Sequence, residues 1–495
     1  MTPIIAETPA PSMTARVVKA VMWRSGSQIV AQLSMWASTF WVLRLLDPSD
    51  YGLYAMTSGV MVLLSMLNGQ GFAGALIRAE TITTAQIRQM FGLLLMMNGA
   101  IALLQFAAAP LVAAYFRYPL VGTMLRVQCL LYLANPFIVL PGALLARAMD
   151  FTRQAKVNLL AAAAGALMAL VGALSGLGVW TLVAAPLVAV WTRAIGMTIA
   201  ARMLVWPSFG LAGASGTVLF GGAMLLSDLF WLVQTQADVA IGGRALDTHR
   251  LGVYTTALFL AQIVTSKFIP PLNEVAFTAY AKLQHDRTSA ARAFERSVGI
   301  IMLVALPFYF GLAVTAPEFV ATMLGPKWHD AIPVVAILAF AMPFLTLQIL
   351  FAPATTALGH TRVQVWSAAA GAVLMPIGFI AGIQWGVLGL AWSWLIAMPL
   401  LTAFTAWIAM PVLGTNSLRL LAAIRPALLA ASGMALVVAL VDRTLPPSDP
   451  VLRLALLVSL GGAVYAGLAW FTARHVVLET IAMLRHSRGQ DAVAR

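Results

Sequence analysis

The sequence has almost no cysteine and few charged residues. Cys129 is the single cysteine among 495 residues, so the chain cannot form an internal disulfide bond. Charged residues make up 9% of the chain, whereas a soluble domain has roughly 25%. These two shortages exclude a disulfide-stapled secreted scaffold and argue against a soluble globular domain.

Histidine and nucleotide-binding motifs are also sparse. The six histidines fall in predicted loops or the tail without the spacing of metal ligands: His249, His285, His329, His360, His475 and His486. No G-x-x-x-x-G-K-[ST] motif is present, which excludes a P-loop for ATP as the direct energy source. We therefore predict no metal site and no cofactor, and expect any driving force to come from a proton or sodium gradient.

Apolar residues dominate what remains. Hydrophobic residues form 61% of the chain and the mean hydropathy is +0.90. Fourteen apolar segments are each long enough to cross about 30 Å of hydrocarbon as a helix. They lie near 20–45, 52–77, 88–115, 119–143, 155–174, 177–201, 215–240, 251–279, 295–316, 331–356, 363–383, 387–411, 420–441 and 451–472. The sequence predicts an all-α, polytopic membrane protein.

The basic excess follows this topology. The 30 Lys and Arg exceed the 17 Asp and Glu, for a net charge of +13, and most lie in loops on the side that holds both termini. The positive-inside rule therefore predicts cytoplasmic N- and C-termini. Because the basic residues are spread over many short loops, they suit anionic lipid headgroups and do not predict nucleic-acid binding.

The chain also repeats itself. LDPSDYGLY at 46–54 returns as LDTHRLGVY at 246–254, Thr152-Arg153 returns as Thr361-Arg362, and GLGVW at 176–180 resembles GVLGLAW at 386–392. Three matches in one order indicate two parallel six-helix repeats. We predict an N-terminal lobe at 1–210, a C-terminal lobe at 211–415, two further helices at 416–475 and a cytoplasmic tail at 476–495.

Polar residues interrupt several predicted spans. The first carries Arg24, Gln28 and Gln32 at i, i+4 and i+8, which places them on one helix face. Arg126 falls inside the fourth span. A charged side chain at mid-membrane costs at least ~2.5–3.5 kcal/mol, so these groups should face a hydrated cavity or one another.

The second repeat carries the remaining charges. Asp228 and Asp238 lie in the seventh span, and the segment SKFIPPLNE at 266–274 puts Lys267 and Glu274 in the eighth, on either side of Pro270-Pro271. The prolines predict a kink that could act as a hinge. Two readings stay open: the charges bind substrate and a coupling ion, or they pair to lock helices together or snorkel to an interface.

The cations suit an anionic ligand. Arg24, Arg126 and Lys267 could hold a diphosphate through charge-assisted hydrogen bonds, with Gln28 and Gln32 beside them. The acids Asp228, Asp238 and Glu274 are candidates to carry a coupling proton or sodium ion.

An ordered set of motifs resembles a known family. The chain resembles the polysaccharide-transport branch of the multidrug/oligosaccharidyl-lipid/polysaccharide exporter superfamily, which contains the Wzx-type flippases of exopolysaccharide and O-antigen assembly. The resemblance runs from about residue 20 to 410. The motifs that carry it are LLDPSDYGLYAM (45–56), GQGFAGALIR (69–78), ALLARAMDFTRQA (143–155), SGLGVWTLVA (175–184), AFTAYAKLQHD (276–286), GPKWHDAIPVVAILAF (325–340) and ALGHTR (357–362). The chain departs from the family pattern at Asp47-Pro48-Ser49 and at Thr278, which we expect to affect turn geometry.

This resemblance implies a flippase of the bacterial inner membrane. It would move an undecaprenyl-diphosphate-linked oligosaccharide to the periplasmic leaflet by alternating access, for exopolysaccharide or lipopolysaccharide export. The implied partners are that lipid-linked oligosaccharide, membrane lipids, and the polysaccharide polymerase and chain-length or export machinery. The resemblance also implies that basic residues such as Arg24 and Lys267 lie in a central cavity.

Three alternative functions fit parts of the sequence less well. An ion-coupled multidrug or organic-cation antiporter would present mainly acids and aromatics, so Arg24 and Lys267 count against it. A membrane enzyme acting on lipid-linked sugars needs a large extracytoplasmic loop, whereas the longest here, near 313–330, has about 18 residues; we predict that the protein is not an enzyme. A scaffold for glycosyltransferases is the weakest of the three.

Overall fold

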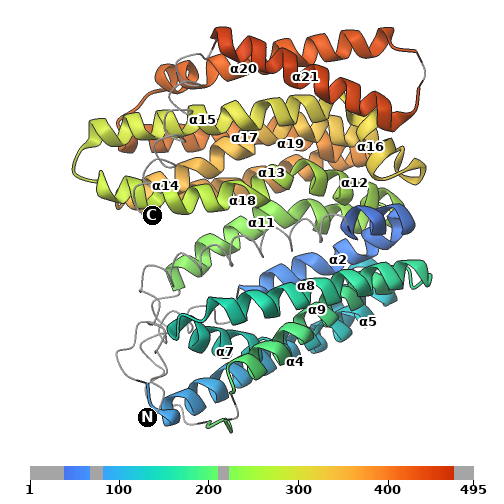
Figure 1. Cartoon of the computed structure of the whole chain (residues 1–495), viewed down its shortest axis with the longest axis vertical. Helices are drawn as coiled ribbons and strands as arrows, with labels where there is room; N and C mark the ends of the chain where they lie inside the picture. Colours follow the sequence, from blue (N-terminus) through green and yellow to red (C-terminus); the bar gives the residue numbers. More distant parts are fainter. Residues whose placement is uncertain (1–37, 67–81, 204, 210–221, 447, 473–495) are drawn as a thin grey trace, which may run out of the picture. The chain divides into compact units, whose positions relative to one another are not determined.

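The computed structural model describes residues 38–66, 82–203, 205–209, 222–446 and 448–472, with the backbone alone for 222–226. Every regular element in these ranges is a helix (Figure 1). The chain divides into two compact units: unit 1 holds Met1–Leu46 and Val60–Leu219, and unit 2 holds Asp47–Gly59 and Phe220–Arg495. Helix α2 (Pro48–Ser65) begins in unit 2 and ends in unit 1.

Unit 1 contains long helices packed through small residues. Its helices are α4 (Thr84–Phe116), α5 (Pro119–Gln128), α6 (Leu130–Ala134), α7 (Pro136–Arg147), α8 (Phe151–Leu174) and α9 (Val179–Ala200). Helices α8 and α9 approach closely because glycine meets a larger residue at each crossing: a Cβ on Gly165 would lie 2.8 Å from that of Ala189, and one on Gly172 2.9 Å from Thr181 Oγ1. Such small-residue contacts are typical of helices packed in a membrane.

Unit 2 contains the remaining helices. They are α11 (Gly222–Ala245), α12 (Thr248–Ala261), α13 (Ile263–Lys267), α14 (Ile269–Lys282), α15 (Arg287–Val314), α16 (Ala316–Met323), α17 (Ala331–Ala357), α18 (Thr361–Gly382), α19 (Gly386–Leu413), α20 (Ser417–Thr444) and α21 (Pro450–Thr472). Short 3-10 turns, η1 (Pro326–Trp328) and η2 (Ile383–Trp385), precede α17 and α19. Helix α17 is the most buried of the candidate membrane spans in the described chain, since 67% of its most apolar 18-residue stretch is buried.

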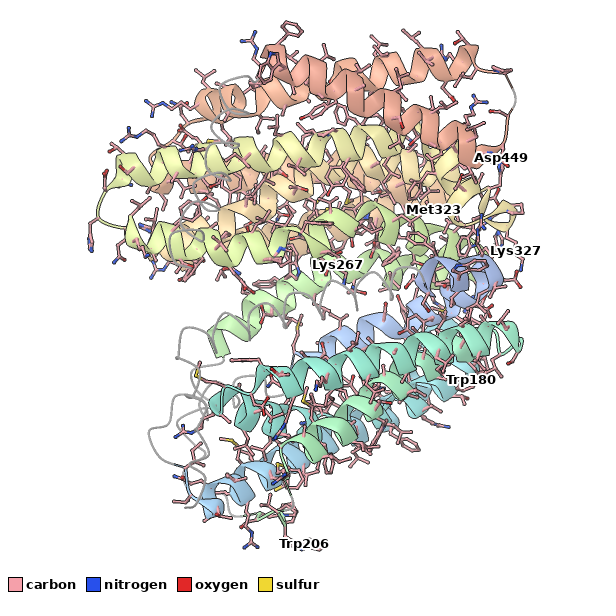
Figure 2. The ribbon with its side chains drawn as sticks, viewed as in Figure 1. Trp180, Trp206, Lys267, Met323, Lys327 and Asp449 are labelled. Atoms are coloured by element: carbon pink, nitrogen blue, oxygen red, sulfur yellow. The ribbon has the colours of Figure 1, made fainter. Side chains whose placement is uncertain are left out.

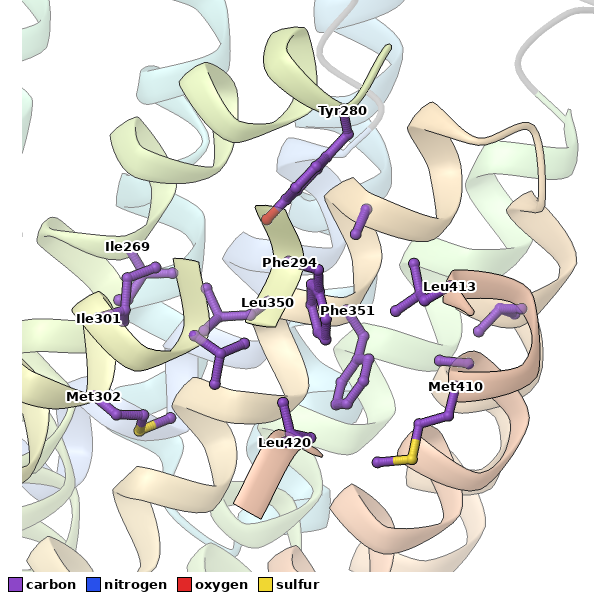
Figure 3. Close-up of a cluster of buried hydrophobic side chains, with 14 of the residues drawn as sticks. Ile269, Tyr280, Phe294, Ile301, Met302, Leu350, Phe351, Met410, Leu413 and Leu420 are labelled. Carbon is purple, nitrogen blue, oxygen red and sulfur yellow. The ribbon is translucent and has the colours of Figure 1, made fainter. Parts of the chain in front are cut away.

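The core of unit 2 joins helices far apart in sequence. Figure 3 shows Phe294 of α15 beside Phe351 of α17, with ring centroids 5.2 Å apart. Ile269 of α14 and Leu413 of α19 belong to the same buried cluster. Burying a large apolar side chain away from water contributes about 1.5–3 kcal/mol, but within a bilayer the gain is mainly close packing.

Most of the predicted spans appear as helices. Nine segments among the described residues are long and apolar enough to cross a membrane, and one of them, Thr361–Leu413, contains both α18 and α19. The predicted spans 20–45, 52–77 and 215–240 lie partly outside the described residues. The fold class is therefore confirmed as all-α with many membrane-spanning helices, while the count of fourteen stays a prediction.

The repeat reappears in the geometry of the helix starts. Helices α2 and α12 begin at Pro48 and Thr248, which occupy the same place in the two LD motifs. Gly178 and Gly386, in the two glycine turns, have φ of +53° and +69°; Gly178 immediately precedes α9, and Gly386 is the first residue of α19. Glycine serves both turns because it adopts positive φ without steric cost.

Candidate functional site

Three of the predicted substrate ligands, Arg24, Gln28 and Gln32, lie outside the described residues. Their role in binding a diphosphate stays a prediction. The other predicted site residues are described, and the structure assigns them to different surroundings.

Lys267 and Glu274 are both exposed within unit 2. Figure 2 shows Lys267 where α13 ends and α14 begins. Among the described residues neither side chain makes an ion pair, so Lys267 is not locked to Glu274 or to Asp228. The cation therefore remains available to an anionic ligand.

The predicted eighth span, 251–279, is not one helix. It is divided into α12, α13 and α14, with breaks at Gln262 and Phe268. Pro270 and Pro271 lie in the first turn of α14, where a proline costs no hydrogen bond because the first amides of a helix have no intrahelical acceptor. The role of these prolines as a hinge stays a prediction.

Arg126 lies in unit 1, on an exposed face of α5. Its guanidinium carbon is 5.4 Å from the centroid of the Phe106 ring of α4, and both side chains are exposed. A cation–π contact of this kind stabilises a guanidinium by about 0.5–1 kcal/mol at an exposed site. This gives Arg126 a partner in the absence of any phosphate.

Asp238 is fully buried and belongs to a hydrogen-bonded cluster. Its Oδ2 accepts a 2.7 Å bond from the Tyr254 hydroxyl, and its Oδ1 accepts one from Val239 N. Trp394 Nε1 in turn donates to the Tyr254 hydroxyl oxygen at 2.7 Å. The cluster ties α11, α12 and α19 together, and it fits a structural role for Asp238 at least as well as an ion-carrying one.

Asp228 lines a cavity of about 290 Å³ between helices of unit 2, here called the polar cavity. The lining carries an unusual number of polar side chains for an apolar bundle. They are Ser227 and Asp228 of α11, Asn273 of α14, Gln348 and Thr355 of α17, Gln364 and Ser367 of α18, and Thr405 of α19. Trp231, one turn from Asp228, adds an aromatic ring. Asp228 is the one predicted site residue in this lining.

A chain of hydrogen bonds fixes one wall of the polar cavity. Gln234 Nε2 donates to Gln348 Oε1 at 3.1 Å, and Gln348 Nε2 donates to Ser367 Oγ at 3.4 Å. The hydroxyls of Ser367 and Thr405 are 2.6 Å apart. These four side chains are buried and come from four helices, so the polar groups are held in place before any ligand arrives.

An ion cluster lies at one end of unit 2, where Glu318 of α16 meets Asp442 near the end of α20 and Arg453 near the start of α21. Arg453 Nε is 3.3 Å from Glu318 Oε1, and Arg453 Nη2 is 2.7 Å from Asp442 Oδ1. Burial and the neighbouring Asp442 carboxylate raise the pKa of Glu318, and the Arg453 charge offsets this shift only in part.

Asp286 caps α15 on the predicted cytoplasmic side. The hydroxyls of Ser289 and Thr288 donate to its carboxylate and lower its pKa.

The sequence prediction missed most of the polar cavity. Asn273 lies within the segment 266–274, where the charged neighbours Lys267 and Glu274 give the stronger sequence signal. Gln348 and Gln364 are amides within strongly apolar spans, which is the signal that could have identified them. No group of three or more potential metal ligands occurs in the described part of the chain.

Known proteins resemble this chain in sequence and in fold. It is 26% identical over 455 residues to the succinoglycan biosynthesis transport protein ExoT of Rhizobium meliloti, covering 91% of this chain and 92% of that one. It is 22% identical over 297 residues to the lipopolysaccharide biosynthesis protein WzxC of Escherichia coli, covering 60% of each. The fold matches an inward closed lipid II flippase, MurJ, with a TM-score of 0.74 at 11% identity, over 90% of this chain and 99% of MurJ.

A family model decides the classification. The model described as polysaccharide biosynthesis protein matches residues 42–333, which is more than half of the chain. This agrees with the motifs at 45–56 and 276–286, which lie within the matched range. The expected resemblance is thus confirmed: the chain is a multi-span membrane protein that belongs to the polysaccharide biosynthesis protein family and has the fold of a lipid flippase.

Proposed function

We propose that the protein translocates an undecaprenyl-diphosphate-linked oligosaccharide from the cytoplasmic to the periplasmic leaflet of the bacterial inner membrane, supplying exopolysaccharide or lipopolysaccharide export. Two observations together carry the proposal: a relative named as a succinoglycan biosynthesis transport protein aligns over 91% of the chain, and the same chain matches the fold of a lipid flippase. The first observation supports a saccharide cargo and the second supports a lipid carrier.

The diphosphate of such a lipid needs a cation inside the protein. Lys267 supports this role because it is exposed, lies between two short helices of unit 2 and has no ion-pair partner among the described residues. A Lys ammonium donates three hydrogen bonds to phosphate oxygens, and such charge-assisted bonds are about twice as strong as neutral ones. In this proposal Arg24, Gln28, Gln32 and Arg126 contribute further donors.

Resetting the site requires a group whose ion occupancy differs between states. An ion drives a two-state equilibrium only through its different affinity for the two states. Glu274 suits this role because it is exposed and unpaired within the described chain, seven residues from Lys267 and beyond Pro270-Pro271. Asp228 and Asp238 are the next candidates, and the two prolines would form the hinge.

The proposed cycle is alternating access between the lobes 1–210 and 211–415, with both termini cytoplasmic. The protein performs no covalent chemistry on the lipid in this proposal. It delivers the repeat unit to a polymerase and to chain-length or export machinery in the same membrane.

Deleting the gene tests the function in cells. We expect the undecaprenyl-diphosphate-linked repeat unit to accumulate on the cytoplasmic leaflet and polymer export to stop. Wild-type protein should restore export, Lys267→Ala should not, and Lys282→Ala at the exposed end of α14 should behave as wild type. Accumulation of an incomplete oligosaccharide, or of none, would contradict a flippase role and favour an enzyme or an exporter of another substrate class.

A further inference from the structure

The polar cavity of unit 2 has a lining that the proposed diphosphate site does not use. Asp228 supplies its only charge, and no Lys or Arg is among the described residues that line it. A phosphate group would meet a carboxylate there and no compensating cation, which is unfavourable. An anionic occupant is therefore unfavourable, and the lining suits a hydroxyl-rich group that donates hydrogen bonds.

Asn273 places beside the cavity one polar atom without a hydrogen-bond partner among the described residues. Asn273 Nδ2 donates to Ile349 O at 3.5 Å, which fixes the amide, while Asn273 Oδ1 is buried and has no hydrogen-bond partner in the described structure. Leaving a buried polar atom without a partner is unfavourable, so such atoms usually mark a bound ligand or water. A hydroxyl donor would satisfy this oxygen.

The remaining lining groups are acceptors and donors held rigidly beside an aromatic ring. Gln348 is fixed by Gln234 and Ser367 on either side, so it need not reorganise when a ligand binds. Trp231 is 37% exposed and lies one turn from Asp228, so an apolar ring and a carboxylate share one end of the lining. A sugar ring matches this pattern, because its C–H faces pack on an aromatic ring while its hydroxyls donate to carboxylate and amide oxygens.

We propose that the polar cavity binds a sugar ring of the translocated lipid-linked oligosaccharide, with Asp228 and Asn273 accepting hydrogen bonds from its hydroxyls and Trp231 packing on its face. The assignment rests on the proposed function and deepens it. The diphosphate would then bind at a cationic site at Lys267, and the saccharide at a separate site whose described lining has no Lys or Arg. It also gives Asp228 a role in recognition in place of ion coupling.

Equilibrium binding to the purified full-length protein in detergent tests the assignment. One probe is the lipid-linked oligosaccharide that accumulates in the deletion strain, and the other is undecaprenyl diphosphate without sugar. Wild-type protein should bind the first more tightly. Asp228→Asn should reduce that preference about tenfold because it removes the charged acceptor, and Trp231→Ala about tenfold because it removes the ring that packs on the sugar. The affinity for undecaprenyl diphosphate should stay unchanged.

A matched control is Trp366→Ala on α18, whose ring is 64% exposed and does not line the cavity; it should keep the full preference. An unchanged preference in both cavity variants would overturn the sugar site while leaving the flippase proposal intact. So would an Asp228→Asn protein that keeps the preference but loses the gradient dependence of transport, because Asp228 would then be a coupling group. If wild-type protein binds neither lipid, the proposed function fails, and the sugar site fails with it.

Discussion

Gly52 of α2 and Gly252 of α12 pack backbone against backbone, 200 residues apart in the chain. A Cβ on Gly52 would lie 3.0 Å from Gly252 N, and a Cβ on Gly252 would lie 2.9 Å from Gly52 N. A second pair of contacts is also reciprocal. A Cβ on Gly52 would clash with the carbonyl oxygen of Thr248, the first residue of α12, and a Cβ on Gly252 would clash with that of Pro48, the first residue of α2. This reciprocity means that the two copies of the LD motif, both within unit 2, are related by a local pseudo-two-fold axis.

Alanine at this crossing should separate the two helices. Because each added methyl would overlap backbone atoms that cannot rotate away, we expect Gly52→Ala and Gly252→Ala each to destabilise the protein by about 1–3 kcal/mol or more and to reduce transport. Apparent melting temperature in detergent and polymer export measure the two effects. Gly467→Ala is the control, since no atom lies within 4 Å of its added Cβ. Wild-type stability in both crossing variants would show that the helices are not in contact.

These two glycines illustrate how far the sequence could predict the fold. Long apolar runs predicted α4, α8, α15 and α21 because membrane solvation requires each run to satisfy its own backbone hydrogen bonds. The repeat of the LD motif indicated the duplication, yet it could not show that Gly52 and Gly252 touch each other. Contacts between distant segments depend on helix rotation and crossing, which apolarity alone does not specify.

The same limit explains the candidate site. Charged residues in apolar segments are easy to detect, so Asp228, Lys267 and Glu274 were predicted. Asn273 and Gln348 were missed because an amide in a span acquires significance only beside partners on other helices. The charge of Asp238 made it a candidate, but the sequence does not predict its hydrogen bonds with Tyr254 and Val239.

The Asp238 cluster predicts a cost for losing one hydroxyl. Tyr254→Phe leaves Asp238 Oδ2 without its donor and Trp394 Nε1 without its acceptor, so we expect a loss of about 1–3 kcal/mol, seen as a lower melting temperature. Tyr309→Phe is a matched control, because its equally buried hydroxyl meets the neutral Thr346 hydroxyl at 3.2 Å. An equal loss in the two variants would argue against a special role for the buried carboxylate.

The ion cluster predicts a pH dependence of stability. Because the pKa of Glu318 is raised in the folded protein, the folded state holds its proton to a higher pH than the unfolded state, and this stabilisation is lost as the pH rises from about 4.5 through the raised value. We therefore expect the melting temperature of wild type, relative to Glu318→Gln, to fall as the pH is increased over that range. A difference that grows with pH would mean that Arg453 holds Glu318 ionised.

Topology gives a further prediction within unit 2. Helix α15 has 28 residues and is therefore about 42 Å long, so the chain segments before and after it should lie on opposite sides of the membrane. With Cys129→Ser as background, Lys282→Cys should react with an impermeant maleimide from the cytoplasmic side and His329→Cys from the periplasmic side. Both positions are exposed. Reaction of both from one side would refute the crossing.

Translocation of the lipid itself tests the central proposal most directly. The purified protein is reconstituted into vesicles that contain a fluorescent lipid-linked oligosaccharide, and an impermeant reductant then destroys the fluorescence in the outer leaflet. Wild-type protein should make nearly all of the label reducible, faster under an imposed proton or sodium gradient, whereas Lys267→Ala vesicles should retain the inner-leaflet signal. If wild-type vesicles keep as much protected fluorescence as protein-free vesicles under either gradient, the protein is not a flippase for this lipid.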